Sequence, residues 1–217
     1  MASPSFITLG GAVSVVSGVV ALFVSYTAYR FLKIGDVNIL TYISVSFMLL
    51  GVGLILQGSL GVMLGLRLGN IYEDARAAYL IGVIYLVVQN VAYLMLVIGY
   101  ARSAFAPLAP VAPMVIITPP QLSRLFLLGH LVFDVSQLVS VLLLMMLVFE
   151  ALLASSRSGG SFSRLVLVAF VVLLLSHVTM LYASLVLTPF YYIVGELVQF
   201  VSFALLLLFL LGWYRVG

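Results

Sequence analysis

The sequence predicts an all-α, polytopic integral membrane protein that forms a single transmembrane domain over residues 1–217. Hydrophobic residues make up 65% of the chain and charged residues only 7%, with a mean hydropathy of +1.35. These values lie far outside those of soluble globular proteins, so lipid must be the main solvent of the folded chain. The apolar residues also fall into six runs, each at least the ~20 residues that a helix needs to cross a bilayer. We therefore expect the protein in a membrane, that of a prokaryotic cell.

Helix breakers separate the six predicted spans. The breakers are Gly35 with Asp36, Gly69 with Asn70, the serine- and glycine-rich run 155–161, and Pro189. The spans that they bound cover residues 6–32, 38–66, 76–101, 122–154, 162–187 and 190–214. Tyrosine and tryptophan residues stand at several span ends, as expected for an aromatic belt at the membrane interface.

The first span begins close to the N-terminus and is not preceded by the basic residues that start a secretory signal peptide. Its apolar run is also too long for the core of such a signal, so we expect it to remain uncleaved. Arg30 and Lys33 follow this span directly. Because basic residues are enriched on the cytoplasmic side of membrane proteins, this pair predicts that the N-terminus lies outside.

Residues 103–120 form a proline-rich apolar segment that is compatible with either a surface loop or a seventh span. The segment holds no charged residue and five prolines, which remove helical hydrogen-bond donors. Unpaired backbone groups in lipid cost several kcal/mol each, which favours a loop on or in the membrane surface. The basic residues favour a seventh span instead, because six spans give neither side a clear excess. Seven spans place six basic residues in the cytoplasm (Arg30, Lys33, Arg102, Arg157, Arg164, Arg215) against three outside (Arg67, Arg76, Arg124).

The two halves on either side of this segment, residues 1–102 and 121–217, show weak internal similarity that predicts a 3+3 repeat. Shifting the third span onto the last by 113 positions aligns Tyr79 with Tyr192, Gly82 with Gly195, and Gly99 with Gly212. Phe47 and Phe170 align at a different offset. Six spans would make the repeat inverted, and seven would make it parallel with a linker helix; both arrangements occur in transporters. Chance similarity between apolar helices is the competing explanation.

The fourth span carries three polar residues on one helix face within its apolar sequence: His130, Asp134 and Gln137. A polar stripe in a hydrocarbon-length helix is costly, so it should face protein or water and by default indicates a functional site. At ~1.5 Å of rise per residue, His177 and Glu196 of the next two spans fall in the same half of the membrane. Gln199 lies one turn below Glu196. These six residues are the predicted site for a ligand, an ion or a proton pathway.

Three interpretations compete for this site. In the first, Asp134 or Glu196 exchanges a proton during transport, while a histidine relays the proton or a cation binds. In the second, a divalent metal or a haem is bound, with His130, His177, Asp134 and Glu196 as candidate ligands. A haem between the two histidines is disfavoured, because the helix rise places them about 6 Å apart in depth. In the third, the polar groups only hold helices together, with interhelical hydrogen bonds of about 0.6–2 kcal/mol each.

Other features of the first three spans predict packing between helices. Gln89 and Asn90, midway along the third span, are explained most simply by interhelical hydrogen bonds, although either would line one wall of a transport cavity. Gly10, Ser14 and Gly18 recur every four residues in the first span. Such spacing of small residues allows two helix backbones to approach closely.

The function that the sequence favours is permeation of a solute or an ion through a polar site between the last three helices. Coupling of this permeation to protons is a more specific form of the same hypothesis. A cofactor-bearing or accessory subunit of a larger membrane complex is the main alternative, and a membrane sensor is the third. No catalytic residue is predicted, because Ser176 and His177 are adjacent in sequence and therefore face apart on a helix. The expected partners are the lipid bilayer, a second copy of the chain, or other membrane subunits. The scattered charges offer no basic face for nucleic acid.

Overall fold

The computed structural model describes residues 4–33, 38–66, 71–104, 125–158 and 161–214. Side chains are described for residues 5–33, 38–66, 80–102, 132–157 and 163–212. These ranges contain six α-helices and no strand. All six helices include a stretch long and apolar enough to cross a membrane, which confirms the predicted all-α polytopic class. The helices are α1 (Pro4–Leu32), α2 (Asn38–Gly65), α3 (Ile71–Ala104), α4 (Leu125–Ser158), α5 (Ser161–Val186) and α6 (Pro189–Tyr214).

Between the ends of the bundle, the outer surface formed by the described side chains is largely apolar. Each helix exposes large hydrophobic side chains, for example Phe23, Leu56, Ile84, Phe149, Leu185 and Leu208. Exposed apolar surface of this extent needs a nonaqueous solvent, because soluble monomers rarely expose large contiguous apolar patches. A lipid bilayer is therefore the environment of the folded chain.

The turn between α5 and α6 shows how local sequence sets a helix boundary. Leu187 adopts a left-handed conformation with φ of 55°, and the Thr188 amide donates a hydrogen bond of 3.2 Å to the Ala183 carbonyl. This geometry ends α5 in the way that helix C-caps usually do, although glycine is the common residue there. Pro189 then occupies the first position of α6, where its missing N–H is not required. Two residues therefore suffice to reverse the chain.

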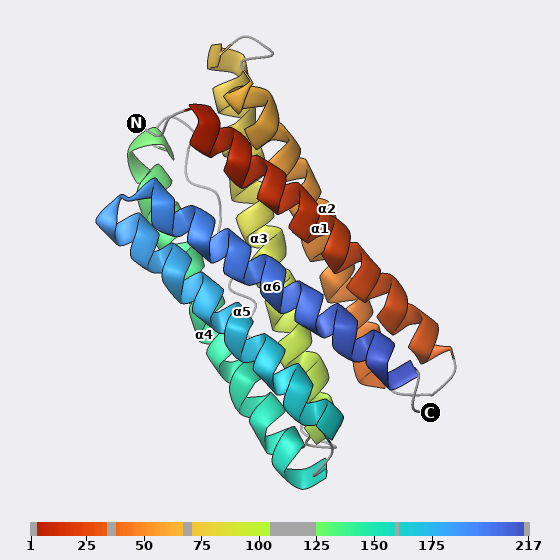
Figure 1. Ribbon diagram of the computed structural model, residues 1–217. Helices are drawn as coiled ribbons and strands as arrows, with labels where there is room; N and C mark the ends of the chain where they lie inside the picture. The colour runs from red at the N-terminus through yellow and green to blue at the C-terminus, as the bar shows by residue number, and fades with distance from the viewer. Residues whose placement is uncertain (1–3, 34–37, 67–70, 105–124, 159–160, 215–217) are drawn as a thin grey trace.

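The six helices pack as a closed ring in chain order. Each helix contacts the one before and the one after it, and α6 returns to contact α1. Figure 1 shows the α1–α2 pair and the α4–α5 pair on opposite sides of α3 and α6. Edge-to-face aromatic pairs fill the centre, with ring centroids 5.3 Å apart for Phe47 and Phe203 and 5.5 Å apart for Tyr100 and Phe170. The core thus joins α2 to α6 and α3 to α5 across the ring.

Helices α3 and α4 run in the same direction. Contacts between α3 and α5 pair Tyr93 with His177 and Tyr100 with Phe170, so residue numbers rise along α3 as they fall along α5. The short connection after Ser158 makes α4 antiparallel to α5 as well. Helix α4 is therefore parallel to α3, as Figure 1 shows. The end of α3 and the start of α4 lie at opposite ends of the bundle.

This parallel arrangement bears on the choice between six and seven crossings. Most of the proline-rich segment 103–120 lies outside the described residues, but the chain between Ala104 and Leu125 connects opposite ends of the bundle. In an alternating six-span topology, the end of α3 and the start of α4 would share one side of the membrane. The six predicted spans are all present, and the directions of the described helices are those that the seven-crossing alternative predicts.

The directions and contacts of the helices also match those expected of a parallel repeat. The order down, up, down in α1–α3 recurs in α4–α6. The middle helix of each half also forms an aromatic pair with the last helix of the other half, α2 with α6 and α5 with α3. The aligned glycines, however, have different surroundings. A Cβ at Gly195 would lie 2.6 Å from Met180, whereas one at Gly82 would meet no described atom within 4 Å. The internal repeat therefore stays a prediction.

Helices α1 and α2 meet along a seam of small residues, defined by Gly11, Gly18 and Ser25 on α1 and by Gly58, Gly51 and Ser44 on α2. A Cβ at Gly11 would lie 2.6 Å from the Gly58 carbonyl oxygen, and one at Gly18 would lie 2.8 Å from that of Gly51. Seven residues further along, the Ser25 hydroxyl donates to the Ser44 carbonyl at 2.7 Å. The seam thus repeats every seven residues. Gly18 packs against α2, whereas Gly10 and Ser14, which share its predicted face, turn toward α6.

Replacing Gly18 with alanine should destabilise the protein, because the new methyl group would meet the backbone of α2 and force the helices apart. Overpacking of this kind costs about 1–3 kcal/mol, and each kcal/mol lowers Tm by about 2–4 °C for a chain of this size. Thermal unfolding of the purified protein in detergent measures the effect. Gly82→Ala is the matched control and should leave Tm unchanged or raise it, since alanine is the better helix former. Equal Tm values for the two variants would contradict the seam.

Arg102→Cys and Ser156→Cys should be labelled from the same side of the membrane. Both side chains are exposed, and the parallel directions of α3 and α4 place both at one end of the bundle. The chain contains no cysteine, so a membrane-impermeant maleimide has no background sites. An alternating six-span topology predicts the opposite result, with the two cysteines labelled from different sides.

Candidate functional site

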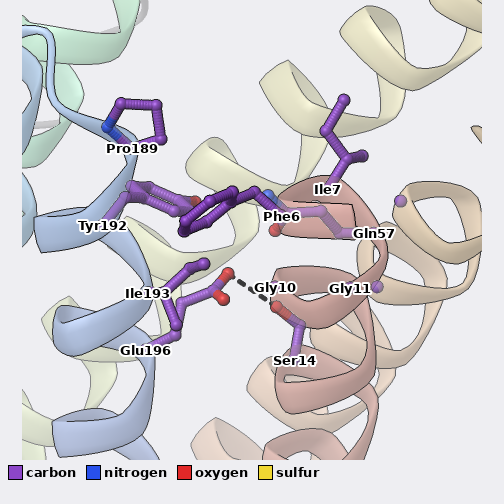
Figure 2. Close-up of a pocket in the computed structure, with 12 residues that line it drawn as sticks. Phe6, Ile7, Gly10, Gly11, Ser14, Gln57, Pro189, Tyr192, Ile193 and Glu196 are labelled. Carbon is purple, nitrogen blue, oxygen red and sulfur yellow. Dashed lines mark hydrogen bonds between the residues drawn. The ribbon is translucent and has the colours of Figure 1, made fainter. Parts of the chain in front are cut away.

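Glu196 is the buried carboxyl group that connects the last helix to the first. It lies in the second turn of α6 and is only 6% exposed. The Ser14 hydroxyl of α1 donates a hydrogen bond of 2.8 Å to its Oε1 atom. The contact is made because α1 and α6 run in the same direction and begin at the same end of the bundle (Figure 1). Figure 2 shows the two side chains pointing toward each other across the gap between these helices.

Gly10 provides the space that this carboxyl group occupies. Gly10 lies one turn before Ser14 on the same face of α1. A Cβ at Gly10 would lie 3.1 Å from Oε2 of Glu196, which is tighter than ordinary van der Waals contact. The small residue therefore allows the carboxyl group to approach the backbone of α1.

The second carboxyl oxygen of Glu196 has no partner among the described residues. Oε2 is buried and receives no hydrogen bond, and the amide nitrogen of Gln199, one turn later, is also unpaired. Buried polar atoms in proteins are nearly always paired, so an unpaired carboxyl oxygen needs an explanation. Glu150 also has an unpaired buried oxygen, but its side chain is only partly buried and lies toward the other end of α4.

A cavity of about 320 Å³ lies beside Glu196, between α1, α2 and α6. This volume is at the lower end of the range for small-molecule sites, roughly 300–1,000 Å³. Glycines of the seam, Gly11 and Gly58, form part of its wall. The lining residues are Phe6, Ile7, Gly10, Gly11, Ser14, Gln57, Gly58, Gly61, Pro189, Tyr192, Ile193 and Glu196.

Aromatic side chains lie between Glu196 and the end of the bundle. In Figure 2, Phe6 of α1 and Tyr192 of α6 extend toward each other on the Pro189 side of the carboxyl group. Gln57 of α2 lines the same cavity as Tyr192. Deeper in the bundle, Tyr85 of α3 lies near Glu196 and Gln199. Aromatic side chains of α1, α3 and α6 and a glutamine of α2 thus lie around the carboxyl group.

His177 belongs to a separate polar network between α3, α4 and α5. The Tyr93 hydroxyl lies 2.6 Å from Nε2, and Nδ1 lies 3.0 Å from the amide oxygen of Gln137. Because an amide oxygen only accepts hydrogen bonds, Nδ1 carries the proton, and Nε2 accepts from Tyr93. His177 and Tyr93 are fully buried and Gln137 is nearly so, and each bond joins two helices. The imidazole is neutral, and both of its nitrogens are satisfied.

The predicted interhelical hydrogen bonds of Gln89 and Asn90 are present. The Gln89 amide donates to the Ser140 hydroxyl at 2.9 Å, and that hydroxyl donates to the Asn90 amide oxygen at 2.9 Å. The Asn90 amide nitrogen donates to the Ser136 hydroxyl at 2.7 Å. These bonds join α3 to α4. They account for both residues by packing alone.

Comparison with protein families, curated proteins and solved structures finds no match for this chain.

The structure does not bring the six residues predicted from the sequence into one site. It pairs Gln137 with His177, whereas Glu196 faces α1 and Gln199 faces α3. Asp134 is half-buried and forms no hydrogen bond with the side chains that the structure describes. His130 lies within α4, but its side chain is outside the described part. The carboxyl site thus lies between the first, second and last helices rather than between the last three.

Among the described side chains, which do not include that of His130, the arrangement does not supply the ligands that the metal and haem interpretations require. Both ring nitrogens of His177 are occupied by Tyr93 and Gln137, so the histidine would have to give up a bond to become a ligand. Among the side chains described, no three His, Asp or Glu groups gather closely enough to hold a metal ion. Glu196 and His177, two of the candidate ligands, belong to different clusters.

Sequence reasoning missed Ser14 and the two aromatic residues, Phe6 and Tyr192, as members of the site. Ser14 was assigned to helix packing, and nothing in its local sequence links it to a residue 182 positions away. The seven-crossing alternative predicts that Ser14 and Glu196 lie at similar depth in the membrane, because the first and last spans start on the same side in that topology.

Replacing Tyr93 with phenylalanine should destabilise the fold, because it leaves Nε2 of the buried His177 without a donor. An unsatisfied buried group costs about 1–3 kcal/mol. The loss should appear as a lower Tm in detergent. Tyr182→Phe, which removes a hydroxyl group from a half-exposed tyrosine on α5, should change Tm little. If Tyr93→Phe is as stable as Tyr182→Phe, the His177 network does not contribute to stability.

Proposed function

We propose that this multi-spanning membrane protein lets a small solute or ion cross the bilayer, with the cavity at Glu196 as the binding site. The observation that carries this proposal is the unpaired Oε2 atom of Glu196, buried beside a cavity of about 320 Å³. Intramembrane ionisable residues are costly, and they usually serve binding or transfer of ions and protons.

A purely structural role for Glu196 fits these contacts less well. The His177 network shows what structural polar groups look like in this protein, because both nitrogens of its imidazole are paired. Glu196 receives one hydrogen bond, from Ser14, and leaves one oxygen unpaired. A glutamine or a serine would tie α6 to α1 at a lower desolvation cost. The carboxyl group is therefore better explained by a ligand that completes its coordination.

The position of the cavity supports the same proposal. Its walls come from α1 and α2 of the first predicted half and from α6 of the second. In transporters built from repeats, binding sites lie at the interface between the repeats, where relative movement of the two parts exposes them to either side. Proton coupling follows if the carboxyl group takes up a proton when the solute leaves.

The charged residues suggest the orientation of the bundle, which we propose has its N-terminus outside. Five basic side chains fall within the described residues, and all of them lie at the end where α1 finishes: Arg30, Lys33, Arg102, Arg157 and Arg164. The positive-inside rule assigns this end to the cytoplasm. The cavity then faces the outer half of the membrane. Labelling of Ser156→Cys by an impermeant maleimide in intact cells would contradict this orientation.

Glu196→Gln should abolish permeation while preserving the hydrogen bond from Ser14, because the amide oxygen still accepts it. Proteoliposomes are tested for uptake of radiolabelled choline, acetate, glycerol and rubidium, and for proton entry with a pH-sensitive dye. At least one probe should enter faster with the wild-type protein than with Glu196→Gln. Glu150→Gln is the matched control and should behave as the wild type. Entry of every probe at the rate of empty liposomes, or equal rates for wild type and Glu196→Gln, would contradict the proposal.

A further inference from the structure

We infer that the solute recognised by this cavity is a small organic cation, bound by the Glu196 carboxylate and the rings of Phe6 and Tyr192. This inference rests on the proposed function and names its substrate class. It follows from the charge, the aromatic walls and the volume of the cavity.

The charge of the cavity is unbalanced. Among the described residues that line it, Glu196 is the single charged one, and no lysine, arginine or histidine is included. A buried carboxylate is stabilised by a positive charge and by hydrogen bonds, and the described residues supply one hydrogen bond, from Ser14. The Oε2 atom, unpaired among the described residues, lies close to Gly10, and both residues line the cavity. A cationic ligand in the cavity supplies the missing charge.

The walls favour an alkylated cation over a hydrated metal ion. Phe6 and Tyr192 approach the space above the carboxylate from two different helices (Figure 2), and aromatic faces attract cations within about 6 Å. Much of the remaining wall is apolar, with Ile7, Ile193 and Pro189. Calcium would require about 6–8 oxygen ligands, and apolar groups cannot replace the water that an inorganic ion loses. Methyl or methylene groups on a nitrogen cation pack well against this lining.

The volume limits the size of the ligand. About 320 Å³ has room for roughly ten groups the size of a water molecule. A protonated amine or quaternary ammonium ion of fewer than ten heavy atoms fits this space. The Gln57 amide lies on the α2 wall and can hydrogen-bond a polar substituent of such a ligand.

Choline and its neutral isostere 3,3-dimethyl-1-butanol test the inference, because they share a shape and differ in charge. With the full-length protein in detergent and in proteoliposomes, choline should raise Tm and enter, whereas the isostere and acetate should do neither. Glu196→Gln should lose both effects by at least tenfold. Tyr192→Leu should weaken choline binding about 2- to 25-fold, the range expected for one cation–π contact. Glu150→Gln should match the wild type.

A second measurement avoids dependence on the folding of Glu196→Gln. A hydrophobic carbodiimide modifies buried carboxyl groups, and mass spectrometry of the wild-type protein reports modification at Glu196. Choline should protect Glu196 several-fold and leave Glu150 unprotected, whereas the isostere should protect neither.

The outcomes separate this inference from the proposed function. Glu196-dependent entry of acetate, glycerol, rubidium or protons without any effect of choline overturns the organic-cation inference and leaves permeation standing. Equal protection by choline and by the isostere also overturns it. Failure of every probe to enter overturns the proposed function and the inference together.

Discussion

The close approach of α1 and α2 is the constraint on which the rest of the bundle depends. Because glycines face each other along the seam, no side chain separates the two backbones at Gly11 and Gly58. The same glycines line the cavity, so the residues that bring the helices together also leave the space beside them. The seam holds α1 in position, and from there Gly10 and Ser14 reach the carboxyl group on α6. Helix packing and the candidate site therefore share one set of small residues.

Two buried ionisable groups at similar depth have opposite surroundings. His177 is neutral and has a partner for each nitrogen, so its energy is lowest when nothing else binds. Glu196 has a partner for one oxygen and a cavity beside the other. Fully satisfied polar networks rigidify a protein, whereas partly satisfied ones mark places where a ligand, ion or water completes the structure. The α3–α4–α5 side of the bundle is thus built for stability, and the α1–α2–α6 side has the features of a binding site.

The membrane class and the six spans follow from composition and helix breakers, because burial of apolar surface in lipid dominates every other term for this chain. Depth along each helix was also predictable, since it depends only on the rise per residue. The rotation of each helix was not, and for that reason His177 and Glu196 were grouped although they face different neighbours. Uniformly apolar spans give little indication of which face points inward. The direction of α4 depended on whether the proline-rich segment crosses the membrane, and backbone chemistry and charge distribution gave conflicting predictions for that segment. The direction of α4 in turn fixes the direction of α6. The contact between Ser14 and Glu196 could therefore not be predicted without it.

The order of biosynthesis gives the contact between Ser14 and Glu196 a further meaning. Their 182-residue separation means that α1 enters the membrane long before α6 is synthesised. Seam contacts form early, because Ser25 and Ser44 are only 19 positions apart. Glu196 enters the bilayer within α6 and is joined to α1 only when that helix completes the ring. A chain that ends before Pro189 therefore contains the residues of the seam and of the His177 network but lacks the carboxyl group, and the candidate site forms after both of them.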